Sequence, residues 1–458
     1  MNSNDFSGLP LPPEVLANLK TLGYETMTPI QAGSLPAVLE GKDVKAQAKT
    51  GSGKTAAFGI GLLQGLDARL YQTQSLVVCP TRELADQVSK ALRQLARPFA
   101  NVKILTLCGG KPMGPQLASL DHPPHVVVGT PGRLLKHCQK GSLKLDQLRT
   151  LVLDEADRML DMGFLDDINA LIAFTPDQRQ TLLYSATYPQ EILAISNQVQ
   201  KDPVEITVES VHDDSVIQQL FYEIGSGSKL DAIETLLRHF RPESSVIFCN
   251  RKQQCEDLAD ALKQRGISAV ALHGDLEQKD RDRVLVLFAN GSIPVLIATD
   301  VAARGLDIKE LAAVINYELP HDPEVYIHRI GRTGRAGNEG LALSLFLPAE
   351  VPRVNVIEEL LDRAPSLQNL PAVSEPTLAI KGSMQTLALN AGRKAKLRPG
   401  DILGALTATG ELTRDHIGKI DIFDMVAYVA MTREKVGKAL EILARSGVKG
   451  RKIQARKA

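Results

Sequence analysis

At residues 48–56 the sequence reads AKTGSGKTA, a spacing of glycine, lysine and threonine that suits a loop around phosphate groups. Gly51 and Gly53 allow a tight turn in which successive backbone N–H groups point at phosphate oxygens. Lys54 can then reach the β- and γ-phosphates, and the Thr55 hydroxyl can bind Mg²⁺. The alternative is a Gly/Ser turn that only happens to precede a lysine. The residues expected to hold the phosphates are Ala48, Lys49, Thr50, Gly51, Ser52, Gly53, Lys54 and Thr55.

A pair of carboxylates follows an apolar run further along, in TLVLDEADRML at residues 150–160. Asp154 beside a phosphate loop could hold Mg²⁺ through water, and Glu155 could orient the water that attacks a phosphoryl group. On its own, an acidic pair after a strand is more commonly a solvated helix start. With the loop in the same α/β unit, the pair predicts a nucleotide-hydrolysing site in which Thr55 and Asp154 bind the metal.

These residues must be positioned by the short strands and longer helices that alternate between residues 42 and 350. The apolar runs are typical of parallel strands that helices cover on both faces. The phosphate loop would lie between a strand at 43–48 and a helix at 55–66, which two glycines weaken. A helix at 83–99 would bury one apolar face, made of Leu84, Val88, Leu92 and Leu95. Further strands are expected at 75–80, 126–130, 150–154, 181–187, 245–250, 269–273, 294–300 and 313–319.

The predicted fold class is therefore α/β, with two doubly wound parallel sheets followed by a small α+β domain. Between the two sheets, the pattern breaks into polar sequence at 202–228 and then restarts. After them, the stretch 365–376 has three prolines in twelve residues, which is typical of a linker. The expected domains are 1–205, 215–365 and 381–458, with a linker at 366–380.

The composition is that of an ordinary globular protein, with 44% hydrophobic and 23% charged residues and no net charge. Residues 381–458 nevertheless hold 16 Lys and Arg against 7 Asp and Glu, which points to a nucleic-acid partner for that end. Five cysteines without CxxC spacing indicate buried reduced thiols. Since neither a signal segment nor a run of about 18 apolar residues occurs, we expect a cytoplasmic protein without membrane contact.

The basic end follows the order β-α-β-β-α-β over residues 384–456, with Gly447 expected to end the second helix. That order is ferredoxin-like, the architecture of the RNA recognition motif. Tyr428 is the one aromatic candidate for stacking on RNA, and ordinary strand packing is an equal alternative. The basic segments are better candidates, with a solvated surface as the alternative. The candidate RNA-binding residues here are Arg393, Lys394, Lys396, Tyr428, Lys449, Arg451 and Lys452.

The residues DEAD at 154–157 resemble the signature of the DEAD-box RNA helicases, and other motifs of that family follow in order. The resemblance covers residues 6 to about 350. Because the family commonly writes its phosphate loop as AxTGxGKT, Ala48 fits the pattern. The other matching motifs are MTPIQ (27–31), PTREL (80–84), GG (109–110), TPGR (130–133), SAT (185–187), VIFCN (246–250), ATDVAARGLD (298–307) and HRIGRTGRAG (328–337).

The resemblance implies two RecA-like domains that bind ATP and Mg²⁺ and hydrolyse ATP. In such an enzyme Arg332 and Arg335 would reach the γ-phosphate from the second domain, so that catalysis requires closure of the two domains. The catalytic residues would be Lys54, Asp154, Glu155, Arg332 and Arg335. The nucleotide would also contact Tyr24, Thr28, Gln31 and Asp307.

The resemblance also implies residues that connect the nucleotide to RNA. In the resemblance, the SAT segment at 185–187 couples the two by bonding back to Asp157. The implied coupling residues are Asp157, Ser185, Thr187 and His328. RNA would be bound through its phosphates and sugars and not through its base edges. The implied RNA contacts of the two RecA-like domains are Thr81, Arg82, Gly110, Thr130, Gly132, Arg133, Arg251, Gly274 and Thr299.

A DEAD-box core joined to such a basic module resembles one bacterial branch of the family. This resemblance implies a monomeric ATP-dependent RNA helicase that acts in large ribosomal subunit assembly, with its module on a hairpin of the large-subunit ribosomal RNA. Four alternatives stay open: an RNA-gated ATPase clamp without strand separation, a general helicase in RNA turnover, an idle RNA-binding scaffold, and a DNA helicase. The intact Lys54, Asp154 and Glu155 speak against the idle scaffold.

Overall fold

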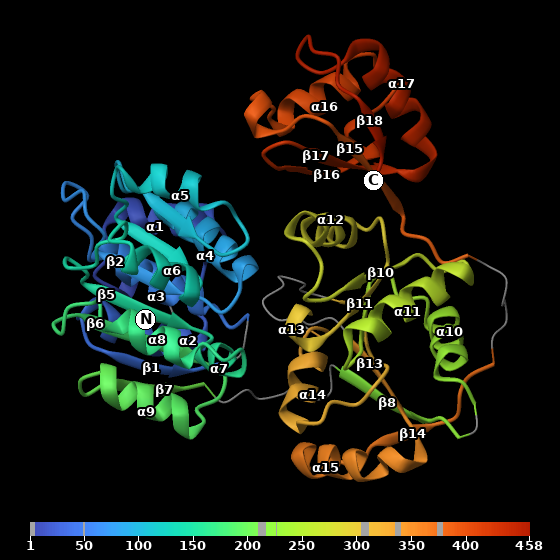
Figure 1. The fold of residues 1–458 in the computed structure, drawn as a ribbon, viewed down its shortest axis with the longest axis horizontal. Helices are drawn as coiled ribbons and strands as arrows, with labels where there is room; N and C mark the ends of the chain where they lie inside the picture. The colour runs from blue at the N-terminus through green and yellow to red at the C-terminus, as the bar shows by residue number, and fades with distance from the viewer. Residues whose placement is uncertain are drawn as a thin grey trace. The chain divides into compact units, whose positions relative to one another are not determined.

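The structure, a computed structural model, describes residues 5–48, 51–208, 217–225, 227–303, 311–334, 340–372 and 379–458. These residues fall into two compact units, the first ending at Val208 and the second beginning at Ile217 (Figure 1). Within the described ranges, no helix is both long and apolar enough to cross a membrane. All five cysteines are buried and free, which agrees with the expected buried thiols.

A parallel sheet of seven strands, in the order β3-β4-β2-β5-β6-β1-β7, forms the centre of the first unit. Its strands are β1 (Val44–Gln47), β2 (Ser75–Val78), β3 (Ile104–Leu107), β4 (Val126–Gly129), β5 (Thr150–Asp154), β6 (Gln180–Ser185) and β7 (Val204–Thr207). The residues of β2, β4 and β5 are buried throughout, because helices cover both faces of the sheet. The predicted doubly wound parallel sheet is therefore confirmed.

The helices of this unit bury two separate apolar cores, one on each face of the sheet. They are α1 (Pro13–Thr21), α2 (Pro29–Leu39), α3 (Lys54–Gln64), α4 (Arg82–Leu95), α5 (Met113–Leu120), α6 (Pro131–Gln139), α7 (Ala156–Asp161), α8 (Leu165–Ile172) and α9 (Gln190–Val199). The predicted apolar face of α4 is buried. In α3 the two glycines permit close packing, because a Cβ on Gly61 would lie 2.1 Å from the Val38 side chain.

The second unit contains a sheet of the same design, in the order β10-β11-β9-β12-β13-β8-β14. Its strands are β8 (Ile217–Glu223), β9 (Ser245–Phe248), β10 (Ala269–Leu272), β11 (Val295–Ala298), β12 (Ala313–Asn316), β13 (Gly340–Phe346) and β14 (Ser366–Gln368). Strands β7 and β8 both fall within the polar break at 202–228. Strand β14 falls in the segment predicted as a linker, where it pairs with the edge of β8.

Helices also cover both faces of this second sheet. They are α10 (Lys229–Phe240), α11 (Lys252–Gln264), α12 (Gln278–Ala289), α13 (Asp300–Ala303), α14 (Pro323–Ile330) and α15 (Val351–Leu361). One core packs α10 and α11 against the strands, and the opposite core packs α14 and α15 (Figure 1). The two sheets together confirm the predicted pair of RecA-like domains.

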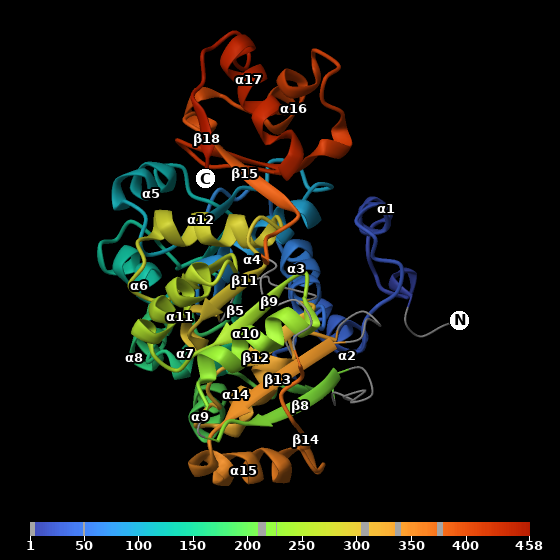
Figure 2. The same ribbon diagram turned by 90° about the vertical axis from the view of Figure 1, so that its right-hand side faces the viewer.

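The end of the chain forms a small antiparallel sheet in the order β16-β17-β15-β18. Its elements are β15 (Met384–Leu389), α16 (Pro399–Thr407), β16 (Ile417–Ile422), β17 (Ala427–Thr432), α17 (Val436–Ser446) and β18 (Ala455–Lys457). Both helices pack on one face of the sheet (Figure 2). Gly447 ends α17 with φ of +62°, as expected of a glycine at that position. The predicted β-α-β-β-α-β module is confirmed.

Candidate nucleotide and RNA sites

The predicted phosphate loop connects β1 to α3 at the carboxyl edge of the first sheet. Gly51 and Gly53 have φ of +87° and +96°, backbone values that favour glycine. Lys54 begins α3 and is buried, and its Nζ donates a 2.9 Å hydrogen bond to the Ala48 carbonyl. The predicted contacts Lys49 and Thr50 lie outside the described residues.

Residues of the predicted adenine motif contact this loop directly. Gln31 donates from Nε2 to the Gly53 carbonyl at 3.1 Å, while its Oε1 accepts the backbone N–H of Thr28 at 2.9 Å. Tyr24 is partly buried and lies edge-on to Phe6, with ring centroids 6.3 Å apart. The contact of Phe6 with Tyr24 was not predicted from the sequence. The available signal was an aromatic residue close to the start of the chain.

Three buried side-chain oxygens near the loop have no hydrogen-bond partner among the described residues: Thr28 Oγ1, Ser52 Oγ and Asp154 Oδ1. Buried polar atoms are almost always paired, so such a group of atoms indicates a place for a polar ligand. Phosphate oxygens, a hydrated Mg²⁺ and a nucleotide base would supply the missing partners. The residues present therefore fit ATP with Mg²⁺.

Asp154 ends β5 and Glu155 follows it just before α7; both are buried, and each has a different environment. Burial raises the pKa of Asp154 to about 7, although the Lys54 ammonium works against that rise. Glu155 has φ of +55° and ψ of +53°, and its Oε2 lies 2.7 Å from Nη1 of Arg158. Sequence reasoning missed Arg158, although a cluster of buried carboxylates requires cations.

Asp157 contacts the SAT segment at the end of β6. The backbone N–H of Asp157 donates to Ser185 Oγ at 3.1 Å, and its Oδ2 accepts the N–H groups of Ala186 and Thr187 at 3.1 and 3.0 Å. Burial would raise the pKa of this carboxyl, but the Thr187 bond and the Lys54 charge hold it below its ordinary value. The expected contact is present, and its coupling role stays a prediction.

The predicted RNA contacts of the first unit gather after β2, β3 and β4. Thr81 caps α4 by accepting the Leu84 N–H at 3.2 Å. The Arg82 guanidinium lies against Gly110, where a Cβ would come within 1.7 Å of it. Arg133 donates from Nη1 to the Lys111 carbonyl at 3.0 Å. Thr130 and Gly132 stand at the start of α6. The RNA role of these residues stays a prediction.

In the second unit, the predicted residues follow the strand ends in the same way. Arg251 precedes α11, Thr299 follows β11, His328 belongs to α14 and a buried Arg332 follows that helix. A Cβ on Gly274 would lie 3.7 Å from the Lys252 side chain. The predicted residues Asp307 and Arg335 lie outside the described residues.

A buried arginine that sequence reasoning missed connects three of the second unit's motifs. Arg329 donates to both oxygens of Asp300, at 2.7 and 2.8 Å, and to the side-chain oxygens of Asn250 and Asn316, at 3.0 Å each. Its position in the HRIGR motif was the available signal. It holds the ends of β9, β11 and β12 together beside α14.

In the C-terminal module, the six basic candidates are exposed, whereas Tyr428 is only 6% exposed. The Tyr428 ring packs edge-on to Phe423, with centroids 5.8 Å apart, and burial raises its pKa. Tyr428 lies on the sheet face opposite the two helices, because its neighbours Ala427 and Val429 belong to the core that the helices cover. Its RNA-stacking role stays a prediction.

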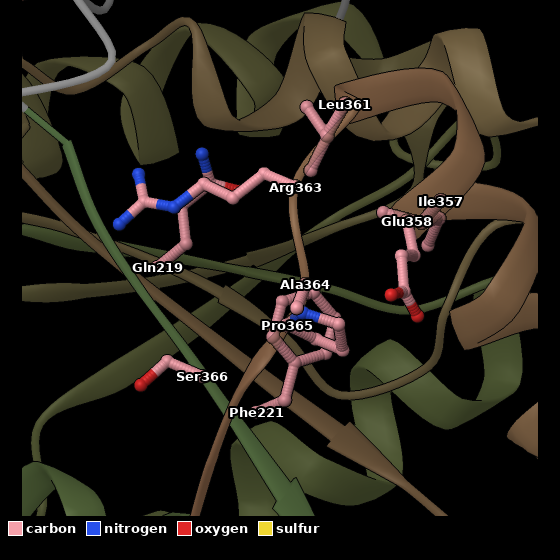
Figure 3. A pocket seen from close by; sticks show the side chains of 9 residues that line it. All are labelled: Gln219, Phe221, Ile357, Glu358, Leu361, Arg363, Ala364, Pro365 and Ser366. Carbon is pink, nitrogen blue, oxygen red and sulfur yellow. The ribbon is translucent and has the colours of Figure 1, made fainter.

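Two pockets lie away from all of these residues. One of about 20 Å³ lies between β8, α15 and β14, where Phe221 and Pro365 close it (Figure 3). The other, of about 280 Å³, lies near Tyr71 and Pro124 before the start of β2 and β4. Neither contains a predicted site residue.

Comparison with known proteins supports the motifs over the whole chain. Residues 28–195 match the DEAD/DEAH box helicase family, residues 228–337 the helicase conserved C-terminal domain, and residues 386–457 the DbpA RNA binding domain. The chain is 56% identical over 446 residues to the ATP-dependent RNA helicase DbpA of Escherichia coli, covering 97% of each. It is 43% identical to the DEAD-box ATP-dependent RNA helicase CshA of Geobacillus kaustophilus, covering 81% of this chain and 79% of that one.

A solved structure has the same core fold. Saccharomyces cerevisiae Dbp5 bound to RNA and ADP BeF3 has a TM-score of 0.72 and 30% identity, covering 80% of this chain and 96% of that one. The motifs, the two RecA-like sheets and the matching C-terminal domain agree with one another. The chain therefore belongs to the DEAD-box ATP-dependent RNA helicases, and within that family to the DbpA type.

Proposed function

We propose that this helicase remodels a hairpin of the large-subunit ribosomal RNA during assembly of the large ribosomal subunit, and that its C-terminal module selects that hairpin. The observation that carries the proposal is the folding of two basic segments, separate in the sequence, into one surface. The predicted domain limits, monomeric state and cytoplasmic location stay predictions.

The two basic segments contact each other, because side chains of the second donate to backbone carbonyls of the first. Lys449 donates from Nζ to the Lys396 carbonyl at 3.5 Å, and Arg451 donates from Nη1 to the Ala395 carbonyl at 3.2 Å. Both Lys396 and Lys449 have positive φ, +57° and +54°, so each stands at a tight turn. Clustered, exposed cations of this kind suit the closely spaced phosphates of a folded RNA.

In the nucleotide site, each residue has a proposed task. The backbone N–H groups after Gly51 and the ammonium of Lys54 would hold the phosphates, and Thr55 with Asp154 would hold Mg²⁺. When bound, Mg²⁺ neutralises charge on the phosphoryl oxygens. Glu155 would orient the attacking water. In related enzymes, an arginine that reaches the transferred phosphoryl group contributes about 10³–10⁵ in rate. Arg332 and Arg335 are the proposed arginines of this kind here.

The proposal is tested with two charge-matched triple variants of the full-length chain. The first variant changes Lys394, Lys396 and Arg451 to Gln. The control variant changes Arg414, Lys419 and Arg445 to Gln, and these residues are also exposed on the module. ATP hydrolysis is measured with the ribosomal hairpin and with an unrelated hairpin of equal length.

Only the first variant should lose the preference for the ribosomal hairpin. The slope of its log binding constant against log salt concentration should become less steep by about 2–3, because three phosphate contacts are lost. A control that loses the preference equally would reduce the module to a general electrostatic anchor. Strand displacement on a duplex joined to the hairpin separates unwinding from an RNA-gated clamp.

A further inference from the structure

Three carboxylates crowd together inside the first unit, at Asp154, Glu155 and Asp157, and all three are buried. A buried carboxylate requires a partner, and each has a different one. Asp157 is held by backbone N–H groups of the SAT segment, whereas one oxygen of Asp154 lacks a described partner. Glu155 is held by an ion pair with Arg158.

The geometry of Glu155 aims its side chain at Arg158. Its backbone lies in the left-handed region, which is uncommon for a residue with a long side chain. Helix α7 begins at the next residue, so Arg158 lies one turn further on the same helix face. The side chains of Glu155 and Arg158 are only 4% and 9% exposed, and Nη1 of Arg158 lies 2.7 Å from Oε2 of Glu155.

Arg158 also acts on the rest of the cluster. Its charge opposes the rise in the pKa of Asp154 that burial causes, and it contributes to the lowered pKa of Asp157. A guanidinium stays charged at all relevant pH values and has a rigid planar shape, so it fixes a carboxylate more firmly than an ammonium does. The pair with Glu155 is thus both a charge partner and a mechanical restraint.

We propose that Arg158 is a positioning residue for Glu155, holding its carboxylate in the orientation from which it aligns the attacking water. The inference rests on the role of Glu155 proposed above. Arg158 then contributes to kcat and not to nucleotide binding. The competing explanation is a buried ion pair that serves only the stability of the fold.

The experiment compares full-length variants in ATP hydrolysis stimulated by saturating bulk ribosomal RNA. Arg158→Met removes the charge and keeps an unbranched side chain, Arg158→Lys keeps the charge, and Glu155→Gln removes the proposed partner. Arg238→Met is the matched control, because Arg238 forms a 2.8 Å ion pair with Glu234 inside α10, with the arginine 5% exposed. Fluorescent ADP affinity and thermal unfolding are measured for every variant.

Arg158→Met should lower kcat by about 10- to 100-fold, the loss expected from a reacting group displaced by about 1 Å. The KM for ATP and the affinity for fluorescent ADP should change by less than about twofold, because only a transition-state interaction is lost. Arg158→Lys keeps the charge but lacks the planar guanidinium, so it should lower kcat less than Arg158→Met does and leave KM unchanged. If the Met variant fails to fold, this loss of kcat is the test, and a wild-type kcat for Arg158→Lys would then overturn the positioning role. Arg238→Met should keep the wild-type kcat.

The double variant decides the mechanism. If Arg158 acts through Glu155, adding Arg158→Met to Glu155→Gln should lower kcat by less than about twofold further. Losses that multiply in the double variant, or a wild-type kcat for Arg158→Met, overturn the positioning role. A wild-type kcat for Glu155→Gln would instead overturn the proposed role of Glu155 itself, so the two failures are distinguishable.

Discussion

Replacing Asp154 with asparagine should stabilise the nucleotide-free protein while it abolishes ATP hydrolysis. Asp154 is fully buried, its Oδ1 has no partner among the described residues, and burial raises its pKa from 3.8 to about 7. A buried carboxylate without a partner lowers the stability of the fold, and its use lies in binding the ligand. Asparagine has nearly the same shape and carries no charge.

The rise of the Asp154 pKa from 3.8 to about 7 sets a ceiling of about 4 kcal/mol on the gain in stability, at about 1.36 kcal/mol per pH unit. Below pH 3.8 the acid is neutral in both states, so its charge costs the folded state nothing. As the pH rises toward 7, the unfolded state ionises first and the folded state loses stability relative to it. Above pH 7 the full difference is present.

Urea unfolding in EDTA is monitored by hydrogen exchange in peptides from β1 and β5. Because both strands belong to the first unit, this measurement reports on the stability of that unit alone. The Asp154→Asn variant should gain about 1–4 kcal/mol over wild type at pH 8, and the gain should shrink steadily toward pH 5. Asp146→Asn, at an exposed position, is the control that should change little. A gain that is independent of pH, or a less stable variant at pH 8, would refute the reasoning.

Three further predictions concern catalysis and RNA. Lys54→Ala should abolish ATP turnover and leave RNA affinity of the module nearly intact; normal RNA-stimulated hydrolysis would contradict the loop assignment. Glu155→Gln should bind ATP and RNA together but release RNA slowly, and release with ATP as fast as without nucleotide would rule out trapping. Arg335→Ala should lower kcat by orders of magnitude with little change in ATP affinity, whereas an effect confined to KM would indicate ground-state binding.

The central strands could be predicted from the sequence because their burial is decided locally. The run TLVLD at 150–154 is apolar throughout, and β5 occupies the same residues. The edge strands β7 and β14 could not be predicted in this way, because half or more of their residues face solvent. Such a segment becomes a strand only where a neighbouring strand offers free backbone groups.

The glycines of α3 illustrate a second limit. Seen along the sequence, Gly59 and Gly61 weaken a helix. In the fold they allow α2 and α4 to approach, since a Cβ on Gly59 would lie 2.9 Å from Leu92. That benefit depends on residues more than 20 positions away in the chain, so no local pattern reveals it.

The nucleotide site shows where motif reasoning ends. A motif names residues whose chemistry is visible in their type, such as Lys54, Asp154 and Glu155, and it predicted that the SAT segment would contact Asp157. It did not name Arg158, because an arginine one turn into a helix is ordinarily a solvated side chain. Only the left-handed backbone of Glu155 turns that carboxylate back toward α7 and buries the pair. A partner defined by backbone geometry rather than by residue type can therefore be found only once the turn itself is known.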